Sequence, residues 1–302
     1  MRIRDPPGAP VTRGVGRQQT YSAAVGVSSD QAPAYGSPQA AIAQNSLWYH
    51  SIEVAPGVVT PGVFDLRPII ARLPWPDVRG RRCLDVGTYD GFLAFELERR
   101  GAAEVMATDI ADHEQWDWPL HLRARGPEYL RHVAGMKRGV GFEIARRLLN
   151  STATLDEVSV YDLDPARVGS FDVVVCGSLL LHLRDPLRAL AAIRSVCGGW
   201  FLSTNQVELG LSVRHRRRAL VRLDGVSDLA QWWLPNAAGH RQMLQAAGFE
   251  IERESRIYSV PFGVAHLAHG RSPRGLAPLL ARVATGGVGV PHHAVLARPG
   301  TA

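Results

Sequence analysis

The chain has 302 residues, of which 46% are hydrophobic and 21% are charged, a mixture typical of a globular protein that buries a sizeable core. No stretch reaches the roughly 18 apolar residues that a membrane-spanning helix needs, and no apolar segment of a secretory signal follows the N-terminal charges. Three cysteines without C-x-x-C spacing favour a reduced, cytoplasmic location. Part of the net charge of +6 lies in the run 214–218, which is more typical of a solvated helix face than of a nucleic-acid site.

Two regions precede the first regular pattern. Residues 1–44 are rich in Gly, Pro, Ala and Ser and lack an apolar period, so we predict a disordered tail. Residues 45–78 begin with aromatic side chains and contain prolines and glycines, which favour extended segments and turns. We expect a short helix between Arg67 and Leu73, which Pro74 ends. We predict that this second region folds back as a lid over the site built by the rest of the chain.

From residue 79 to residue 302, short apolar runs alternate with helical periods, which is typical of a doubly wound α/β domain. We predict a Rossmann-like, seven-stranded, mostly parallel sheet with helices on both faces. The expected strands are 83–86, 105–108, 158–161, 173–176, 200–203, 250–259 and 294–298. The expected helices are 92–100, 142–149, 187–196 and 237–247. Residues 111–140 and 206–235 interrupt this rhythm, and such insertions at the carboxyl edge of a parallel sheet commonly build substrate sites.

The strongest motif is the run from Asp85 to Gly91, which reads Asp-Val-Gly-Thr-Tyr-Asp-Gly and joins a buried strand to a helix. Such a turn needs glycine where φ is positive or where a ligand approaches the backbone. The spacing G-x-x-x-G lacks the three glycines of a pyrophosphate cradle, so we expect a ligand with a nucleoside and an amino-acid end. A second strand ends in Asp109, eighteen residues after Gly91, where a carboxylate can accept both ribose hydroxyls.

These residues resemble class I S-adenosylmethionine-dependent methyltransferases, and the resemblance extends from about Trp48 to the C-terminus. It implies that the first motif holds the methionine end, that the acid after the second strand holds the ribose, and that a third acid contacts the adenine amine. The resemblance implies these cofactor-binding positions: Asp85, Gly87, Thr88, Tyr89, Gly91, Asp109, Ile110, Tyr161, Asp162, Gly177 and Ser178. For Asp162 a simple turn carboxylate is the alternative, and Asp164 is a rival.

A narrower resemblance connects the chain to the bacterial tRNA wobble-uridine carboxymethyltransferase and its relatives. It depends on the stretch around Trp48 and on the run from Leu179 to Asp185 after the fourth motif. The tRNA enzyme has a tyrosine before the histidine of this run, and here that position is Leu181. We therefore expect ordinary S-adenosylmethionine as cofactor and not its carboxylated form.

Three histidines are candidates for the base that a hydroxyl acceptor requires. His182 follows the strand expected to face the transferred methyl group, and it is either the base or a supporting histidine. His50 reaches the site if the lid folds over it, and its alternative is a packing role. His240, in the first turn of a helix, is the third candidate. No Cys/His cluster has zinc spacing, so we expect no metal.

The acceptor pocket is predicted from aromatic residues in the lid and in the second insertion. Indole rings bury a large area at low entropic cost, which suits a pocket wall. The predicted substrate-binding residues are Trp48, Tyr49, Trp232, Trp233 and Asn236.

These observations predict methyl transfer to a small-molecule acceptor, such as a hydroxyl of a sugar or a natural product. One alternative is a tRNA-modifying enzyme, which would need a continuous basic face at the cofactor site. Another is a non-catalytic nucleotide-binding module, because a fold does not determine a function. No membrane partner is expected, and the sequence leaves the oligomeric state open.

Overall fold

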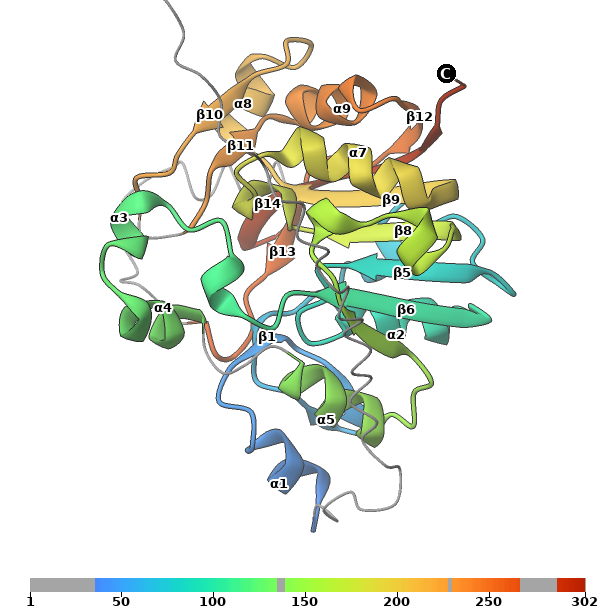
Figure 1. The fold of residues 1–302 in the computed structure, drawn as a ribbon, viewed down its shortest axis with the longest axis vertical. Coiled ribbons are helices and arrows are strands. Elements are labelled where there is room, and N and C mark those ends of the chain that lie inside the picture. Colours follow the sequence, from blue (N-terminus) through green and yellow to red (C-terminus); the bar gives the residue numbers. More distant parts are fainter. Residues whose placement is uncertain (1–35, 135–138, 228–229, 267–286, 302) are drawn as a thin grey trace, which may run out of the picture. The chain divides into compact units, whose positions relative to one another are not determined.

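The central sheet decides where the site lies. The computed structural model describes residues 36–134, 139–227, 230–266 and 287–301, and the predicted tail up to residue 35 lies outside them. Among the described residues, seven strands follow the order β12-β14-β9-β8-β5-β6-β7, and an eighth, β13, pairs with β14 (Figure 1). Their bounds are β5 Arg82–Val86, β6 Glu104–Asp109, β7 Thr154–Glu157, β8 Phe171–Gly177, β9 Cys197–Gln206, β12 Phe249–Glu254, β13 Tyr258–Pro261 and β14 Gly289–Pro299.

The sheet is parallel from β7 to β9 and antiparallel around β14. This arrangement matches the predicted Rossmann-like α/β class, with β13 added to the seven expected strands. The carboxyl ends of β5, β6 and β8 meet at one edge, because parallel neighbours in register end at the same level. Residues that directly follow these strands are therefore neighbours although they are far apart in the chain.

Helices cover both faces of the sheet because its strands are apolar on both sides. Cys83, Val173 and Val175 pack on one face with helices α2 (Phe92–Arg99) and α5 (Val140–Leu148). Leu84, Val174 and Cys176 pack on the other face, together with helices α6 (Pro165–Val168), α7 (Pro186–Val196) and α9 (Ala237–Ala246). Figure 1 shows α7 and α9 on one side of the sheet and α2 and α5 on the other.

Two strand predictions were wrong. The strand expected at 158–161 lies earlier, as β7, because the Ser159 side chain accepts a hydrogen bond from the Tyr161 N–H and starts the 3-10 helix η3 (Val160–Asp162). The strand expected at 250–259 is divided into β12 and β13. Between them the Ser255 hydroxyl oxygen accepts a hydrogen bond from the backbone N–H of Ala294, so the side chain takes the place of a ladder partner.

The N-terminal segment packs beside α5 and over the first face of the sheet. It contains α1 (Pro38–Ile42), four short strands and η1 (Ile70–Arg72). The strands are β1 Trp48–His50, β2 Glu53–Ala55, β3 Val58–Val59 and β4 Gly62–Phe64. Helix α1 lies within the range predicted as a disordered tail, where the Ser37 side chain caps it. The helix expected near residue 70 is reduced to a single 3-10 turn.

The two insertions form small subsidiary structures at the carboxyl edge. The first contains η2 (His113–Gln115), α3 (Leu120–Arg123) and α4 (Pro127–Ala134). The second contains α8 (Leu209–Arg214) and the antiparallel pair of β10 (Val221–Leu223) and β11 (Trp233–Pro235). Between them lies η4 (Leu180–His182), directly after β8. No helix of the described residues is long and apolar enough to cross a membrane.

Candidate active site

The turn after β5 has the backbone conformation that the glycine spacing predicts. Gly87 and Gly91 have φ values of 73° and 94°, in the left-handed region that favours glycine. A Cβ on Gly87 would lie 2.9 Å from the Leu179 side chain, and one on Gly91 would overlap the ring of Phe95. Tyr89, at φ 56°, shares this conformation without being glycine. A tyrosine held in this conformation is strained, and such strain is concentrated at functional sites.

The carboxyl group of Asp85 lies beneath this turn and is 1% exposed. Its Oδ2 accepts a hydrogen bond from the Thr88 hydroxyl at 2.7 Å, while Oδ1 has no hydrogen-bond partner among the described residues. Burial raises the pKa of Asp85 to about 7, against the opposing hydrogen bond from Thr88. A buried carboxylate oxygen without a partner is costly and indicates that a donor belongs nearby.

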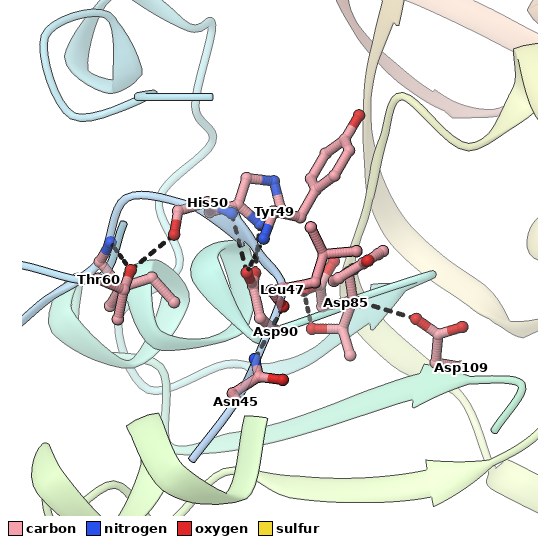
Figure 2. Close-up of polar contacts among 11 residues, drawn as sticks. Asn45, Leu47, Tyr49, His50, Thr60, Asp85, Asp90 and Asp109 are labelled. Carbon is pink, nitrogen blue, oxygen red and sulfur yellow. Dashed lines mark hydrogen bonds and ion pairs between the residues drawn. The ribbon is translucent and has the colours of Figure 1, made fainter. Parts of the chain in front are cut away.

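Asp109 ends β6 and lies next to the same turn (Figure 2). Its carboxylate accepts hydrogen bonds from the backbone N–H of Tyr89 at 2.7 Å and of Ile110 at 2.8 Å. A carboxylate can accept several hydrogen bonds, which makes this side chain chemically suited to ligand hydroxyls. The predicted grouping of the first motif with Asp109 is therefore present in the structure.

Four further positions were expected to bind the cofactor, two after β7 and two at the end of β8. The Tyr161 hydroxyl donates a hydrogen bond to Asp117 at 2.5 Å, which engages its polar atom, and Asp162 is exposed in η3. Gly177 and Ser178 lie at the end of β8, and the Ser178 N–H donates to the Thr204 carbonyl oxygen at 2.8 Å.

His50 forms a histidine–carboxylate pair with Asp90, and Figure 2 shows this pair at the turn. The His50 Nδ1 hydrogen-bonds Oδ1 of Asp90, and the backbone N–H groups of Tyr49 and His50 both donate to Oδ2 at 2.8 Å. Asp90 is 1% exposed, and the Tyr49 ring stacks on Tyr89 with centroids 4.9 Å apart. The first strand of the N-terminal segment is thus fastened directly to the turn.

The other two histidines have different surroundings. His182 lies in η4, and its Nδ1 hydrogen-bonds the carbonyl oxygen of Ala230 at 2.9 Å. His240 is fully buried between α9 and the sheet, where it contacts the Ser203 hydroxyl at 3.0 Å and His293 at 3.2 Å. Burial and the neighbouring histidines hold the pKa of His240 well below its usual range. The prediction of His240 as a base is therefore corrected, since this side chain serves the packing of α9.

Two predicted substrate residues are structural. Trp48 is 1% exposed in the hydrophobic core, and its indole N–H donates to the Ile42 carbonyl oxygen. Asn236 is fully buried at the start of α9. Its Oδ1 accepts from the N–H groups of Gly239 and Leu220, and its Nδ2 donates to the carbonyl oxygens of His215 and Arg218. With these groups engaged, neither side chain can bind an acceptor, which corrects both predictions.

Trp232 and Trp233 are half-buried and hold the second insertion against η4 and the first insertion. The indole N–H of Trp232 donates to the Asp117 carbonyl oxygen at 2.6 Å, and its backbone N–H donates to Leu181. The indole N–H of Trp233 donates to the carbonyl oxygen of Arg184 at 3.1 Å. The Trp232 ring thus lies at the boundary between the two insertions, and the Trp233 ring lies beside the segment between η4 and α7.

Three residues at this edge were missed by sequence reasoning. Asp90 lies inside the glycine motif, and this position was the one sequence signal that could have identified it as a site residue. Asp117 accepts from the Tyr161 hydroxyl and from the Arg184 N–H, and His292 contacts the Ser178 hydroxyl. Neither of the last two has a local sequence pattern, because their partners come from distant strands and loops. Among the described residues no group of three or more His, Cys, Asp or Glu side chains could hold a metal ion.

Comparison with known proteins identifies the family. A family model described as a methyltransferase domain matches residues 64–254. The ubiquinone biosynthesis O-methyltransferase of Thiobacillus denitrificans is 31% identical over 192 residues, which cover 60% of this chain and 71% of that protein. The chain belongs to the methyltransferase domain family.

Other proteins resemble this methyltransferase over a shorter length or with lower identity. The ubiquinone biosynthesis O-methyltransferase of Neisseria meningitidis serogroup C is 35% identical over 131 residues, so the match covers 42% of this chain and 45% of that protein. The chain thus spans less than half the length of this relative. An S-adenosylmethionine-dependent methyltransferase structure from Mesorhizobium loti has a TM-score of 0.43 and 16% identity, covering 74% of this chain and 93% of that one.

S-adenosylmethionine is the methyl donor of this methyltransferase family, and the turn fits it. The unpartnered oxygen of Asp85 suits the methionine end, which carries an ammonium group. The Asp109 carboxylate would hold the ribose hydroxyls, because a carboxylate accepts hydrogen bonds from such donors. When bound, the cofactor supplies an electrophilic methyl group, while the protein aligns the acceptor with it.

Proposed function

We propose that this methyltransferase transfers the methyl group of S-adenosylmethionine to a hydroxyl of a small molecule, such as a sugar or a natural product. The observation that carries the proposal is the His50–Asp90 pair at the cofactor turn. A hydroxyl attacks poorly unless its proton is removed, so a positioned base is required. Relatives named O-methyltransferases support the same chemistry.

The geometry of the pair suits His50 for the role of base. Asp90 is fixed by two backbone N–H groups, so the His50 Nδ1 that faces it carries a hydrogen and donates to the carboxylate. The other ring nitrogen, Nε2, then has a lone pair that can accept the acceptor's proton. The Asp90 carboxylate stabilises the imidazolium that forms, as the carboxylate does in a Ser-His-Asp triad. The His50 side chain is 13% exposed, so the ring is reachable from one side.

His50 also lies close to the cofactor turn. A positive charge on its ring would oppose the rise in the pKa of Asp85, and the centroid of its ring lies 5.4 Å from that of Phe92, the first residue of α2. The described contact of His182, by contrast, leads to Ala230 in the second insertion. We therefore place His50 ahead of His182 as the base and assign His182 to the support of the acceptor side.

The test combines an acceptor panel with two matched substitutions. Purified protein is incubated with S-adenosylmethionine and either a panel of hydroxylated metabolites or total tRNA, and methylated products are identified by mass spectrometry. We expect small-molecule methyl ethers and no tRNA product. His50→Gln should lower kcat by about 10²–10⁴ with nearly unchanged affinity for S-adenosylhomocysteine, and His182→Gln should have the smaller effect. Exclusive methylation of tRNA would overturn the proposal, and a fully active His50→Gln protein would transfer the role to His182.

A further inference from the structure

The basic run of residues 214–218 has no part in the proposed chemistry, and the structure shows where it lies. Arg214 ends helix α8, and residues 215–218 lie in the turn that follows, where the Arg218 N–H donates to the His215 carbonyl oxygen. The run is therefore not the helix face that its sequence suggested. Figure 1 shows α8 and the next strand, β10, at the margin of the second insertion, away from the central sheet.

The charge of this region is not neutralised by the chain itself. The stretch 213–223 contains five arginines and no acidic residue. Among the described residues, one of the five forms ion pairs, since Arg222 contacts Glu208 at 3.4 Å and Asp224 at 3.6 Å. The other four arginines are exposed, namely Arg214, Arg216, Arg217 and Arg218. Because a guanidinium group stays charged in proteins, the turn presents a local excess of positive charge.

A single buried side chain fixes the backbone of the turn. Asn236, at the start of α9, is fully buried. Its Nδ2 donates to the carbonyl oxygens of His215 at 3.0 Å and of Arg218 at 2.8 Å. Its Oδ1 accepts from the N–H of Leu220 at 3.0 Å. The polar backbone groups of the turn are thus bound to the interior while its arginine side chains are exposed, so their positions are set by the fold.

Aliphatic side chains are exposed next to these charges. Val221 and Leu223 alternate with Arg222 along β10, so they share the face of the strand opposite to the ion pairs. Val226 follows in the turn after β10 and is 85% exposed. Of nine exposed large hydrophobic side chains among the described residues, five lie in the two insertions, namely Leu120, Val213, Val221, Leu223 and Val226. Such a concentration of exposed apolar side chains indicates an interaction surface.

The first insertion contributes to the same edge of the molecule. Ala230 packs against the hydrophobic cluster of α3 and α4, and the Trp232 indole N–H donates to the Asp117 carbonyl oxygen. The two insertions are therefore in contact at the carboxyl edge of the sheet. Leu120, the first residue of α3, is exposed on this edge as well. A partner of this surface must supply both negative charge and an apolar medium.

We propose that the second insertion docks the enzyme on the surface of a bilayer that contains anionic lipid. Arginines at the headgroups combined with aliphatic side chains at the acyl boundary are the chemistry of proteins that lie on a membrane without spanning it. A nucleic acid supplies phosphates, but its binders commonly add aromatic rings that stack on bases, and the exposed hydrophobic side chains of this surface are aliphatic. A second copy of the chain would bring the same positive charge and be repelled.

Vesicle sedimentation of the full chain tests the contribution of charge. Vesicles of phosphatidylcholine alone are compared with vesicles that also contain phosphatidylglycerol, and we expect binding to the anionic vesicles that added salt weakens. Arg216→Gln combined with Arg217→Gln should lower the partition coefficient about 10- to 30-fold, since each arginine near an anionic surface contributes about fivefold. The matched control is Arg79→Gln combined with Arg81→Gln, two exposed arginines before β5 that change the net charge equally. This control should bind almost as the wild type does.

A second pair of substitutions tests the apolar contribution at constant charge. Leu223→Asn combined with Val226→Asn should lower the partition coefficient about 10-fold or more, because both side chains would otherwise leave water. Val288→Asn, an exposed valine outside the insertions, should not lower it. We expect all these variants to keep the wild-type affinity for S-adenosylhomocysteine, which shows that they fold.

Three results would overturn the proposal. The first is equal binding of wild type to neutral and anionic vesicles, and the second is an equal loss in the two arginine double variants. The third is binding of total tRNA, lost in the Arg216/Arg217 variant, without binding to anionic vesicles, which would assign the surface to a nucleic acid. No methyl acceptor enters these measurements, so their failure is distinguishable from a failure of the proposed hydroxyl chemistry.

Discussion

Replacing Asp90 with asparagine exchanges one carboxylate oxygen of the histidine–carboxylate pair for an NH₂ group. The wild-type carboxylate is 1% exposed and accepts three hydrogen bonds, two from backbone N–H groups at 2.8 Å and one from the His50 ring. An asparagine has one carbonyl oxygen and one NH₂ group at the same place. We expect its oxygen to remain on the two backbone N–H groups, because both donors already point at this position from 2.8 Å.

The NH₂ group of the asparagine would then face Nδ1 of His50. Two donors cannot share a hydrogen bond, so the imidazole must move its hydrogen from Nδ1 to Nε2. In this tautomer Nε2 cannot accept the acceptor's proton, although the ring has hardly moved. We expect kcat to fall by about 10²–10⁴, the range of a lost general base. The loss of a charged acceptor from a buried network should also lower the free energy of unfolding by about 1–3 kcal/mol.

The assay measures kcat and KM for methyl transfer, the affinity for S-adenosylhomocysteine and the free energy of unfolding. Asp77→Asn is the matched control, since Asp77 pairs with Arg79 on the surface and its side chain is 64% exposed. Turnover at the wild-type rate in folded Asp90→Asn protein would refute the reasoning. If the affinity for S-adenosylhomocysteine fell by the same factor as kcat, the pair would serve the cofactor and not the acceptor.

Three further predictions concern binding and stability. Asp109→Ala should cost about 1.5–3 kcal/mol of binding free energy for S-adenosylhomocysteine, measured by titration, and unchanged affinity would remove Asp109 from the ribose site. Asn236→Ala should lower the free energy of unfolding by about 2–4 kcal/mol without changing that affinity, because it deletes a helix cap and buried hydrogen bonds. The pKa of His292 is depressed from 6.5 to about 4 in the fold, so below pH 6.5 the unfolded chain binds the extra proton and stability falls. This contribution, at most about 3 kcal/mol between pH 6.5 and 4, should be absent in His292→Gln, and identical pH slopes for both proteins in denaturant titrations would contradict it.

The sequence predicted the features that depend on local physics. Positive φ values at Gly87 and Gly91 follow from the freedom of glycine and the crowding at the strand–helix turn. Apolar runs on both faces of β5 and β8 require helices on both sides of the sheet, and helices pack on both sides. The position of Asp109 follows in the same way, because parallel strands end at a common edge.

The tertiary structure decided which polar side chains meet. His50 and Asp90 are 40 positions apart, Ser178 and His292 are 114 apart, and their contacts depend on the order and register of strands that no local pattern encodes. Burial, which also depends on the tertiary structure, decided the roles of Trp48, His240 and Asn236. Their residue types suit a site, but their surroundings engage them in packing and capping. A hydrogen-bonding side chain acquires its role from the partners that folding brings to it, so residue type and spacing could nominate the histidines, and only the assembled sheet could rank them.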